Sequence, residues 1–264
     1  MGHRRINRHM KDVETSKKVK RENSVLFTLL FIIFFILFII SFIKIILYIS
    51  NTITNKKLIK EINKSVSIEQ GEDESIKYNI DFDVLRLINS DIVGYVDVSG
   101  TDIGYTVVKT DNNEYYLNHN YEKNYSDLGW IFADYRNKFD EKDKNIIIYG
   151  HNMKNGTMFA SLKTILTDEW FNNKDNRFVT FVKEDKEINY EVFSVYQIGN
   201  EEKYIQTDFK ENEFKSWADE MKSRSKYDFG IEIGEDDKVI TLSTCGNTSS
   251  TRVVLHAKEI IKGE

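Results

Sequence analysis

The hydrophobic pattern divides the chain into one long apolar segment near the N-terminus and a longer region of short apolar runs. Residues 25–43 form a nineteen-residue stretch in which only Thr28 and Ser41 are polar, and apolar residues resume at 45–49 after Lys44. At about 1.5 Å per residue, a helix of this length crosses the roughly 30 Å hydrocarbon core of a bilayer. The pattern therefore predicts a transmembrane helix over residues 25–49.

Two other kinds of segment share this hydrophobicity. A buried core helix is apolar on all sides, but it is typically shorter than this stretch. A cleaved signal peptide has a shorter apolar region that ends at a small-residue site. Here the apolar run leads into Tyr-Ile-Ser-Asn-Thr-Ile, with no A-x-A-like site. We therefore expect a signal anchor that stays attached to the protein.

Charge on the two flanks predicts how this anchor is oriented. Residues 1–24 carry eight Lys and Arg against three acidic residues, although Lys44, Lys56, Lys57 and Lys60 on the other flank reduce the contrast. Basic flanks stay in the cytoplasm by the positive-inside rule. We expect a single-pass protein of the cell membrane, with residues 1–24 as a cytoplasmic tail and the remainder outside the cell.

The pattern after the anchor changes to short apolar runs bounded by turn-forming residues. Residues 50–70 are polar and Lys-rich, which is typical of a juxtamembrane linker or helix, and residues 71–264 are expected to form one folded domain. Asp81 is the expected N-cap of a short helix over 81–89. Two further helices are predicted, one around 158–164 together with 168–172 and one around 211–223. Strands are predicted at 92–98, 103–108, 130–135, 145–149, 178–182, 188–198, 239–244 and 252–260. Eight short strands with few helices between them predict a mainly β fold, an eight-stranded β-barrel with peripheral helices.

Composition narrows the classes of function. The chain of 264 residues is 41% hydrophobic and 13% aromatic, which supports a packed core. Its net charge of −5 includes the basic tail, so the main domain is acidic and nucleic acid is not an expected partner. One cysteine and scattered histidines do not make a zinc site, and no EF-hand spacing occurs. We expect neither a metal nor a cofactor.

Cys245 is the only cysteine, and it ends the apolar run Val-Ile-Thr-Leu-Ser-Thr-Cys. A lone thiol forms no intramolecular disulfide, so it is either a small buried hydrophobe or a reactive group. A cysteine nucleophile needs a base that favours the thiolate and donors that stabilise an oxyanion.

Five histidines are candidate bases. His3 and His9 lie in the expected cytoplasmic tail, and His119 lies in a polar loop where a solvated ring is expected. His256 shares a strand face with Arg252 by alternation, although packing at the sheet edge is the simpler interpretation. His151 follows the apolar run 145–149 and Gly150, a residue that permits a sharp turn, so its ring is expected to project from a strand end.

Arg252 begins the next apolar strand after Cys245. Residues 246–251 between them are turn formers, which predicts that the two strands form a hairpin. Neighbouring strands lie about 4.8 Å apart. The guanidinium of Arg252 is then expected to reach over Cys245 and to bind a developing oxyanion, although a solvated strand-end arginine is the plainer alternative.

Three blocks together identify a family. Ala133-Asp-Tyr-Arg-Asn137, then Tyr149-Gly-His151-Asn-Met, and finally Thr241-Leu-Ser-Thr-Cys245 followed by Arg252-Val-Val, resemble the class B sortases of Gram-positive bacteria. The resemblance runs from about Asp81 to Ile260. It departs from the family in two places: the Cys245 to Arg252 interval is short, and Tyr105-Thr106 stands where a Tyr-Pro pair is common.

The resemblance implies a sortase β-barrel and a cysteine transpeptidase without a cofactor. Cys245 matches the nucleophile, His151 the general acid/base, and Arg252 the oxyanion-binding or substrate-orienting arginine. The partners it implies are the C-terminal sorting motif of secreted proteins and an amine of peptidoglycan or a lipid-linked precursor. Matching substrate-groove residues are Asn113, Leu117, Ser243, Tyr204 and Ile205.

Two alternatives stay open from the residues alone. A cell-surface cysteine protease needs the same Cys and His, and differs in resolving the thioester with water. A catalytically silent, membrane-tethered binding module uses the same groove but is expected to lack Cys245, His151 or Arg252, all of which are present.

Overall fold

A computed structural model of the chain describes residues 2–70, 76–199, 201–245 and 251–261. The chain divides into two compact units, residues 1–50 and 51–264.

The first unit is helical throughout its described residues. It forms most of the helix α1, Gly2–Ile62. From Val25 to Ile49 its apolar side chains are exposed. This part of α1 is long and apolar enough to span a membrane by length and composition.

The second unit begins with the last twelve residues of α1, where Leu58 and Ile62 are buried in the domain core. The domain core therefore includes residues that precede position 70. Residue 71, the predicted start of the domain, lies outside the described residues. A short turn of 3-10 helix and a hairpin follow: η1 (Asn63–Ser65), β1 (Val66–Gln70) and β2 (Ile76–Ile80). The sequence analysis missed this hairpin, because its alternating polar and apolar residues are mostly exposed.

The remaining strands close into a barrel, as predicted. Among the described residues its order is β10-β8-β7-β3-β4-β5-β6-β9, with β4–β5 and β6–β9 parallel and the other pairs antiparallel. The strands are β3 (Ile92–Val98), β4 (Ile103–Val108), β5 (Phe132–Ala133), β6 (Asn145–His151), β7 (Phe178–Val182), β8 (Glu187–Ile198), β9 (Val239–Cys245) and β10 (Arg252–Glu259).

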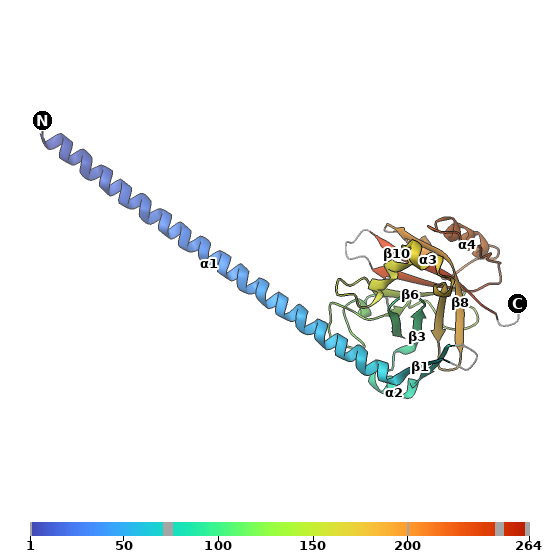
Figure 1. Cartoon of the computed structure of the whole chain (residues 1–264). Helices are drawn as coiled ribbons and strands as arrows, with labels where there is room; N and C mark the ends of the chain where they lie inside the picture. Colours follow the sequence, from blue (N-terminus) through green and yellow to red (C-terminus); the bar gives the residue numbers. More distant parts are fainter. Residues whose placement is uncertain (1, 71–75, 200, 246–250, 262–264) are drawn as a thin grey trace. The chain divides into compact units, whose positions relative to one another are not determined.

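Helices and 3-10 turns lie around the barrel. In Figure 1, α2 and β1 lie on the opposite side of the domain from α3 and α4. The α-helices are α2 (Phe82–Ile88), α3 (Asp168–Asn172) and α4 (Phe214–Ser223), and the 3-10 segments are η2 (Tyr115–Leu117), η3 (Phe159–Leu166), η4 (Lys174–Asn176) and η5 (Lys203–Ile205). The predicted cap of α2 is confirmed, because the carboxylate of Asp81 accepts a hydrogen bond from the Val84 amide at 3.0 Å.

Three elements differ from their predictions. The helix predicted over 211–223 begins at Phe214 as α4. The strand predicted over 130–135 is reduced to Phe132–Ala133, because the Asp134 carboxylate accepts the Arg136 amide and turns the chain out of the sheet. The helix predicted at 158–164 is a 3-10 segment, η3, which places Phe159, Leu162 and Ile165 in the core at a spacing of three residues.

Candidate active site

The parallel pair β6 and β9 brings the predicted nucleophile and base together. The register runs from Asn145 opposite Val239 to His151 opposite Cys245, so both residues lie at the carboxyl ends of adjacent strands. Strand β6 is apolar and buried on both faces through Gly150, as expected for an inner parallel strand. The buried strand provides a rigid support for His151.

The sequence predicted a sharp turn at Gly150, but the chain does not turn there. Strand β6 continues through it to His151. A Cβ at position 150 would lie 2.5 Å from Ile131 Cδ1 and 2.6 Å from the Phe159 ring. The glycine is needed because two core side chains pack directly against the backbone, and this packing fixes the end of the strand.

His151 is half-buried and is oriented by the backbone of η2. Its Nε2 lies 2.8 Å from the carbonyl oxygen of Leu117. A carbonyl oxygen can only accept a hydrogen bond, so Nε2 must carry a proton. In the neutral ring Nδ1 is then unprotonated, and it is the nitrogen that can take up and release a proton. Gly129, at φ +58°, allows close approach here, because its Cβ would lie 2.9 Å from the Leu117 oxygen and 3.0 Å from His151 Cδ2.

Arg252 begins β10, which pairs antiparallel with β9 as the predicted hairpin requires. Its backbone is opposite Ile198 of β8, and its side chain is half-buried. The next amide, of Val253, donates to Thr244 Oγ1 at 2.9 Å and holds the two strand ends together. The turn-forming residues 246–250 lie outside the described residues.

The predicted substrate-groove residues fall into exposed and buried sets. Asn113, Leu117 and Ile205 are partly accessible. Tyr204 and Ser243 are 3% and 1% exposed, and their hydroxyl oxygens are 3.0 Å apart. Tyr204 and Ser243 thus form a hydrogen-bonded support beneath the surface.

Asp134 is a central residue that the sequence analysis did not select, although it lies in the quoted Ala-Asp-Tyr-Arg-Asn block. It is fully buried, and its carboxylate accepts from Asn113 Nδ2 (3.0 Å), Tyr149 Oη (2.8 Å) and the Arg136 guanidinium (2.7 and 2.8 Å). Arg136 also donates to the Ile205 carbonyl at 2.9 Å. One carboxylate therefore connects the Asn113 loop with the Ile205 turn.

The ionisation of Asp134 follows from these contacts. Burial alone raises the pKa of a carboxyl group, but the hydrogen bonds from Arg136 and Tyr149 outweigh it and lower the pKa of Asp134 below its usual value. The same pair raises the pKa of Arg136, chiefly through the hydrogen bond to Asp134. The carboxylate is thus charged, paired and fixed at neutral pH.

Two histidines lie elsewhere than expected. His119 is not a solvated loop residue: its ring stacks on Tyr115 at 4.1 Å and contacts the Tyr115 carbonyl through Nδ1 at 2.7 Å. His256 is not at the sheet edge but fully buried, within 2.8 Å of Thr241 Oγ1 and Tyr196 Oη. Alternation placed His256 on the correct strand face, but barrel closure and α4 cover that face, since Trp217 packs edge-on against the imidazole.

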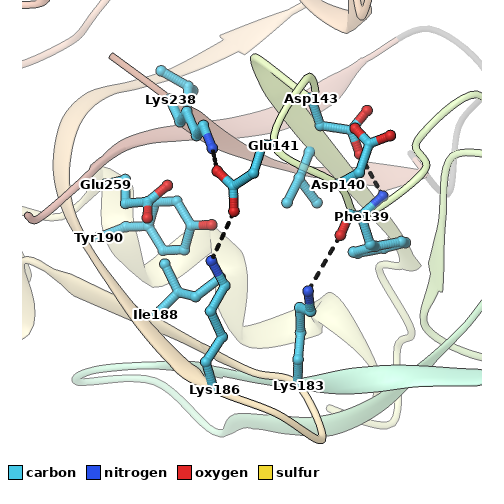
Figure 2. Close-up of a pocket in the computed structure, with 12 residues that line it drawn as sticks. Phe139, Asp140, Glu141, Asp143, Lys183, Lys186, Ile188, Tyr190, Lys238 and Glu259 are labelled. Atoms are coloured by element: carbon cyan, nitrogen blue, oxygen red, sulfur yellow. Dashed lines mark hydrogen bonds and ion pairs between the residues drawn. The ribbon is translucent and has the colours of Figure 1, made fainter. Parts of the chain in front are cut away.

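A separate pocket lies at the other end of β6 and β9, where these strands begin. Figure 2 shows Glu141 between the ammonium groups of Lys186 and Lys238, with Lys183 bound to the Phe139 carbonyl. Seven-residue strands place this pocket roughly 20 Å from His151. Among the described residues, no group of three or more His, Cys, Asp or Glu side chains is arranged to hold a metal ion.

Comparison with known proteins agrees with this barrel and its strand ends. The Sortase domain family matches residues 96–260. Sortase B of Listeria monocytogenes is 38% identical over 184 residues, which cover 67% of this chain and 73% of that protein.

Solved structures give the same result. Sortase B from B. anthracis in complex with AAEK1 matches with a TM-score of 0.70 and 32% identity, over 81% of this chain and all of that one. A Staphylococcus aureus sortase B–substrate complex matches with a TM-score of 0.64 and 32% identity, over 69% of this chain and 85% of that one. The chain belongs to the sortase family, in class B, and is a cysteine transpeptidase.

Proposed function

We propose that Cys245, His151 and Arg252 are the catalytic residues of this transpeptidase. The observation that supports this most directly is the register of β6 and β9, in which His151 is opposite Cys245. Residues on neighbouring strands are about 4.8 Å apart, so a side chain from each reaches a common substrate carbonyl.

In the proposed reaction, the Cys245 thiolate attacks the carbonyl of the scissile peptide bond and a tetrahedral oxyanion forms. His151 protonates the departing amine and a thioester remains on Cys245. An incoming amine then attacks the thioester, gives its proton to His151 and releases the thiolate. With reference pKa values of about 8.5 and 6.5, the thiolate–imidazolium pair of two non-interacting groups is on the order of 1% populated near neutrality. A cation that lies nearer to the sulfur than to the imidazole raises that fraction.

Arg252 is the proposed cation and oxyanion donor. Val254 is opposite Ser243 in the β9–β10 pair. Extending this antiparallel register by two residues brings Arg252 opposite Cys245. A planar guanidinium there offers several fixed N–H donors to the oxyanion.

The sorting-motif peptide is proposed to bind beside Asn113, Leu117 and Ile205, above the Tyr204–Ser243 pair. Asp134 and Arg136 support this assignment, because together they hold Asn113 and the Ile205 turn in fixed positions. The Staphylococcus aureus relative is solved as a substrate complex, which supports a substrate-binding site on this chain as well.

We place the enzyme in the cell membrane by the apolar part of α1, with its N-terminus in the cytoplasm and the barrel outside. The supporting observations are the exposed apolar side chains from Val25 to Ile49 and the basic residues before them. The clients are then secreted proteins with C-terminal sorting motifs. The acceptor is an amine of peptidoglycan or its lipid-linked precursor.

The test uses the full chain in detergent micelles with a panel of fluorogenic peptides carrying variant sorting motifs. We expect an acyl-enzyme adduct at Cys245 in the intact mass spectrum, absent from Cys245→Ala. Adding an amine acceptor should accelerate thioester turnover and yield a ligated product. Hydrolysis without ligation at any acceptor concentration indicates a protease instead, and no adduct with any peptide overturns the proposal.

A further inference from the structure

Asn55 is a polar residue on the apolar face of the juxtamembrane end of α1. Residues Asn55, Leu58 and Ile62 follow helical spacing and are 3%, 7% and 2% exposed within the second compact unit. Leucine or isoleucine at position 55 would bury apolar area without the cost of removing an amide from water. Stability alone does not account for an asparagine here.

The carboxamide of Asn55 joins the helix to the loop before β5. Its Nδ2 donates to the Asn51 carbonyl at 3.0 Å and to Ser126 Oγ at 2.7 Å. Its Oδ1 and the Thr52 Oγ1 are buried without a hydrogen-bond partner among the described residues. An unpaired buried acceptor costs free energy, so this helix–loop contact is specific rather than optimised for strength.

Ser126 is linked by backbone hydrogen bonds to the segment that orients His151. The Ser126 amide donates to the Asn118 carbonyl, and the Gly129 amide donates to the Ser126 carbonyl, each at 2.9 Å. Asn118 follows Leu117, whose carbonyl binds His151 Nε2. Ser126 therefore fixes both backbone segments that contact the imidazole, one through Leu117 and the other through Gly129.

We propose that Asn55 is a positioning residue for His151, acting through Ser126 and the 117–129 loop. The inference rests on the proposed catalytic role of His151. In consequence, the helix that leaves the apolar segment also orders the active-site loop, so an enzyme cut free of its anchor within this helix loses part of its activity.

The test compares full-length variants in detergent micelles. Asn55→Leu removes the hydrogen bond and keeps the site filled, Asn55→Ala tests the same bond with a smaller side chain, and Ser126→Ala removes the acceptor. Lys56→Ala, an exposed neighbour on the same helix, is the matched control. Alkylation of Cys245, the only thiol in the chain, reports the Cys–His environment as a function of pH without any peptide.

We expect Asn55→Leu to lower kcat about three- to tenfold, as for one buried hydrogen bond, with KM within about twofold. The pH profile of Cys245 alkylation should shift in the same direction as in His151→Gln, but by a smaller amount. The melting temperature should not fall. Ser126→Ala should show the same changes as Asn55→Leu. The double variant that combines the two should lower kcat little further than either single variant.

Two results would overturn this inference alone. In the first, Asn55→Leu leaves both kcat and the alkylation profile unchanged, while His151→Gln shifts the profile. This result contradicts the positioning role and leaves the proposed function intact. The other is a fall in activity that merely follows the loss of folded protein. If His151→Gln itself leaves the profile unchanged, the proposed Cys–His pair fails and the positioning role with it.

Discussion

The imidazole Nε2 of His151 lies 2.8 Å from the carbonyl oxygen of Leu117, in a segment 34 residues earlier in the chain. Because this oxygen accepts only, the contact selects one tautomer and aims Nδ1 away from η2. The orientation of the proposed acid/base thus depends on backbone geometry rather than on a carboxylate partner.

Replacement of His151 tests this orientation. Glutamine can keep a donor near the Leu117 carbonyl, but it cannot exchange a proton, so His151→Gln should lower the acylation rate about 10²- to 10⁴-fold with little change in melting temperature. Stopped-flow acylation with a sorting-motif peptide provides the rate. Retention of activity within tenfold of the parent would exclude His151 as the acid/base.

Arg252→Lys keeps the charge and removes the planar fork. We expect kcat to fall about 10²- to 10³-fold, the usual loss for an oxyanion donor, while peptide affinity changes little. Affinity is measured in a Cys245→Ala background to prevent turnover. The control is Lys258→Arg, the reciprocal exchange at the far end of β10, which should retain activity. Unchanged turnover in Arg252→Lys would contradict the proposed role of Arg252.

Asp134→Asn breaks a buried ion pair while keeping the side-chain shape. We expect a loss of about 2–3 kcal/mol in the free energy of unfolding, less than for a fully buried pair because Arg136 is 36% exposed. The KM for the peptide should rise, since Asn113 and the Ile205 turn lose their common support. Asp185→Asn, which removes an exposed carboxylate paired with Lys183, is the control and should change stability by less than about 0.5 kcal/mol.

The pH dependence of Asp134 has a definite sign. Its pKa is lower in the folded state, so its stabilising contribution is present above the ordinary carboxyl pKa of about 3.9 and is lost as pH falls through the folded value. Acid unfolding curves of the parent and Asp134→Asn should therefore converge as the pH is lowered. Parallel curves throughout would show that the carboxylate is not paired.

His256 predicts a second pH effect, at a higher pH. Burial lowers the pKa of His256 from 6.5 to about 3. The unfolded chain then binds a proton below about pH 6.5 that the folded protein does not, so stability is lost as pH falls through this window, by about 1.4 kcal/mol per pH unit at most.

Urea unfolding at pH 7 and pH 5, followed by fluorescence of the buried Trp130, Trp170 and Trp217, measures this effect. The parent should lose about 1–2 kcal/mol more than His256→Gln between these two pH values. Equal losses in the two proteins would place the imidazole in contact with solvent.

Local sequence pattern was sufficient for most of the barrel strands, and it selected the three residues proposed as catalytic. Strands β3, β4 and β7 and helix α3 have the predicted boundaries, because alternation and turn residues are properties of neighbouring positions. The β-barrel also followed from the count and spacing of strands. Cys245 and His151 were selected because each follows an apolar run, and Arg252 because it begins the next one.

Only the tertiary structure decided which of these ends meet and what orients them. Four contacts join residues far apart in the chain: the parallel pairing of β6 with β9, the Leu117 carbonyl on His151, the Asp134 carboxylate on Asn113, and the Asn55–Ser126 hydrogen bond. Periodicity reports which positions share a strand face, but not which partner lies on that face. Closure of the barrel determines that partner, because it brings distant strands and loops into hydrogen-bonding distance.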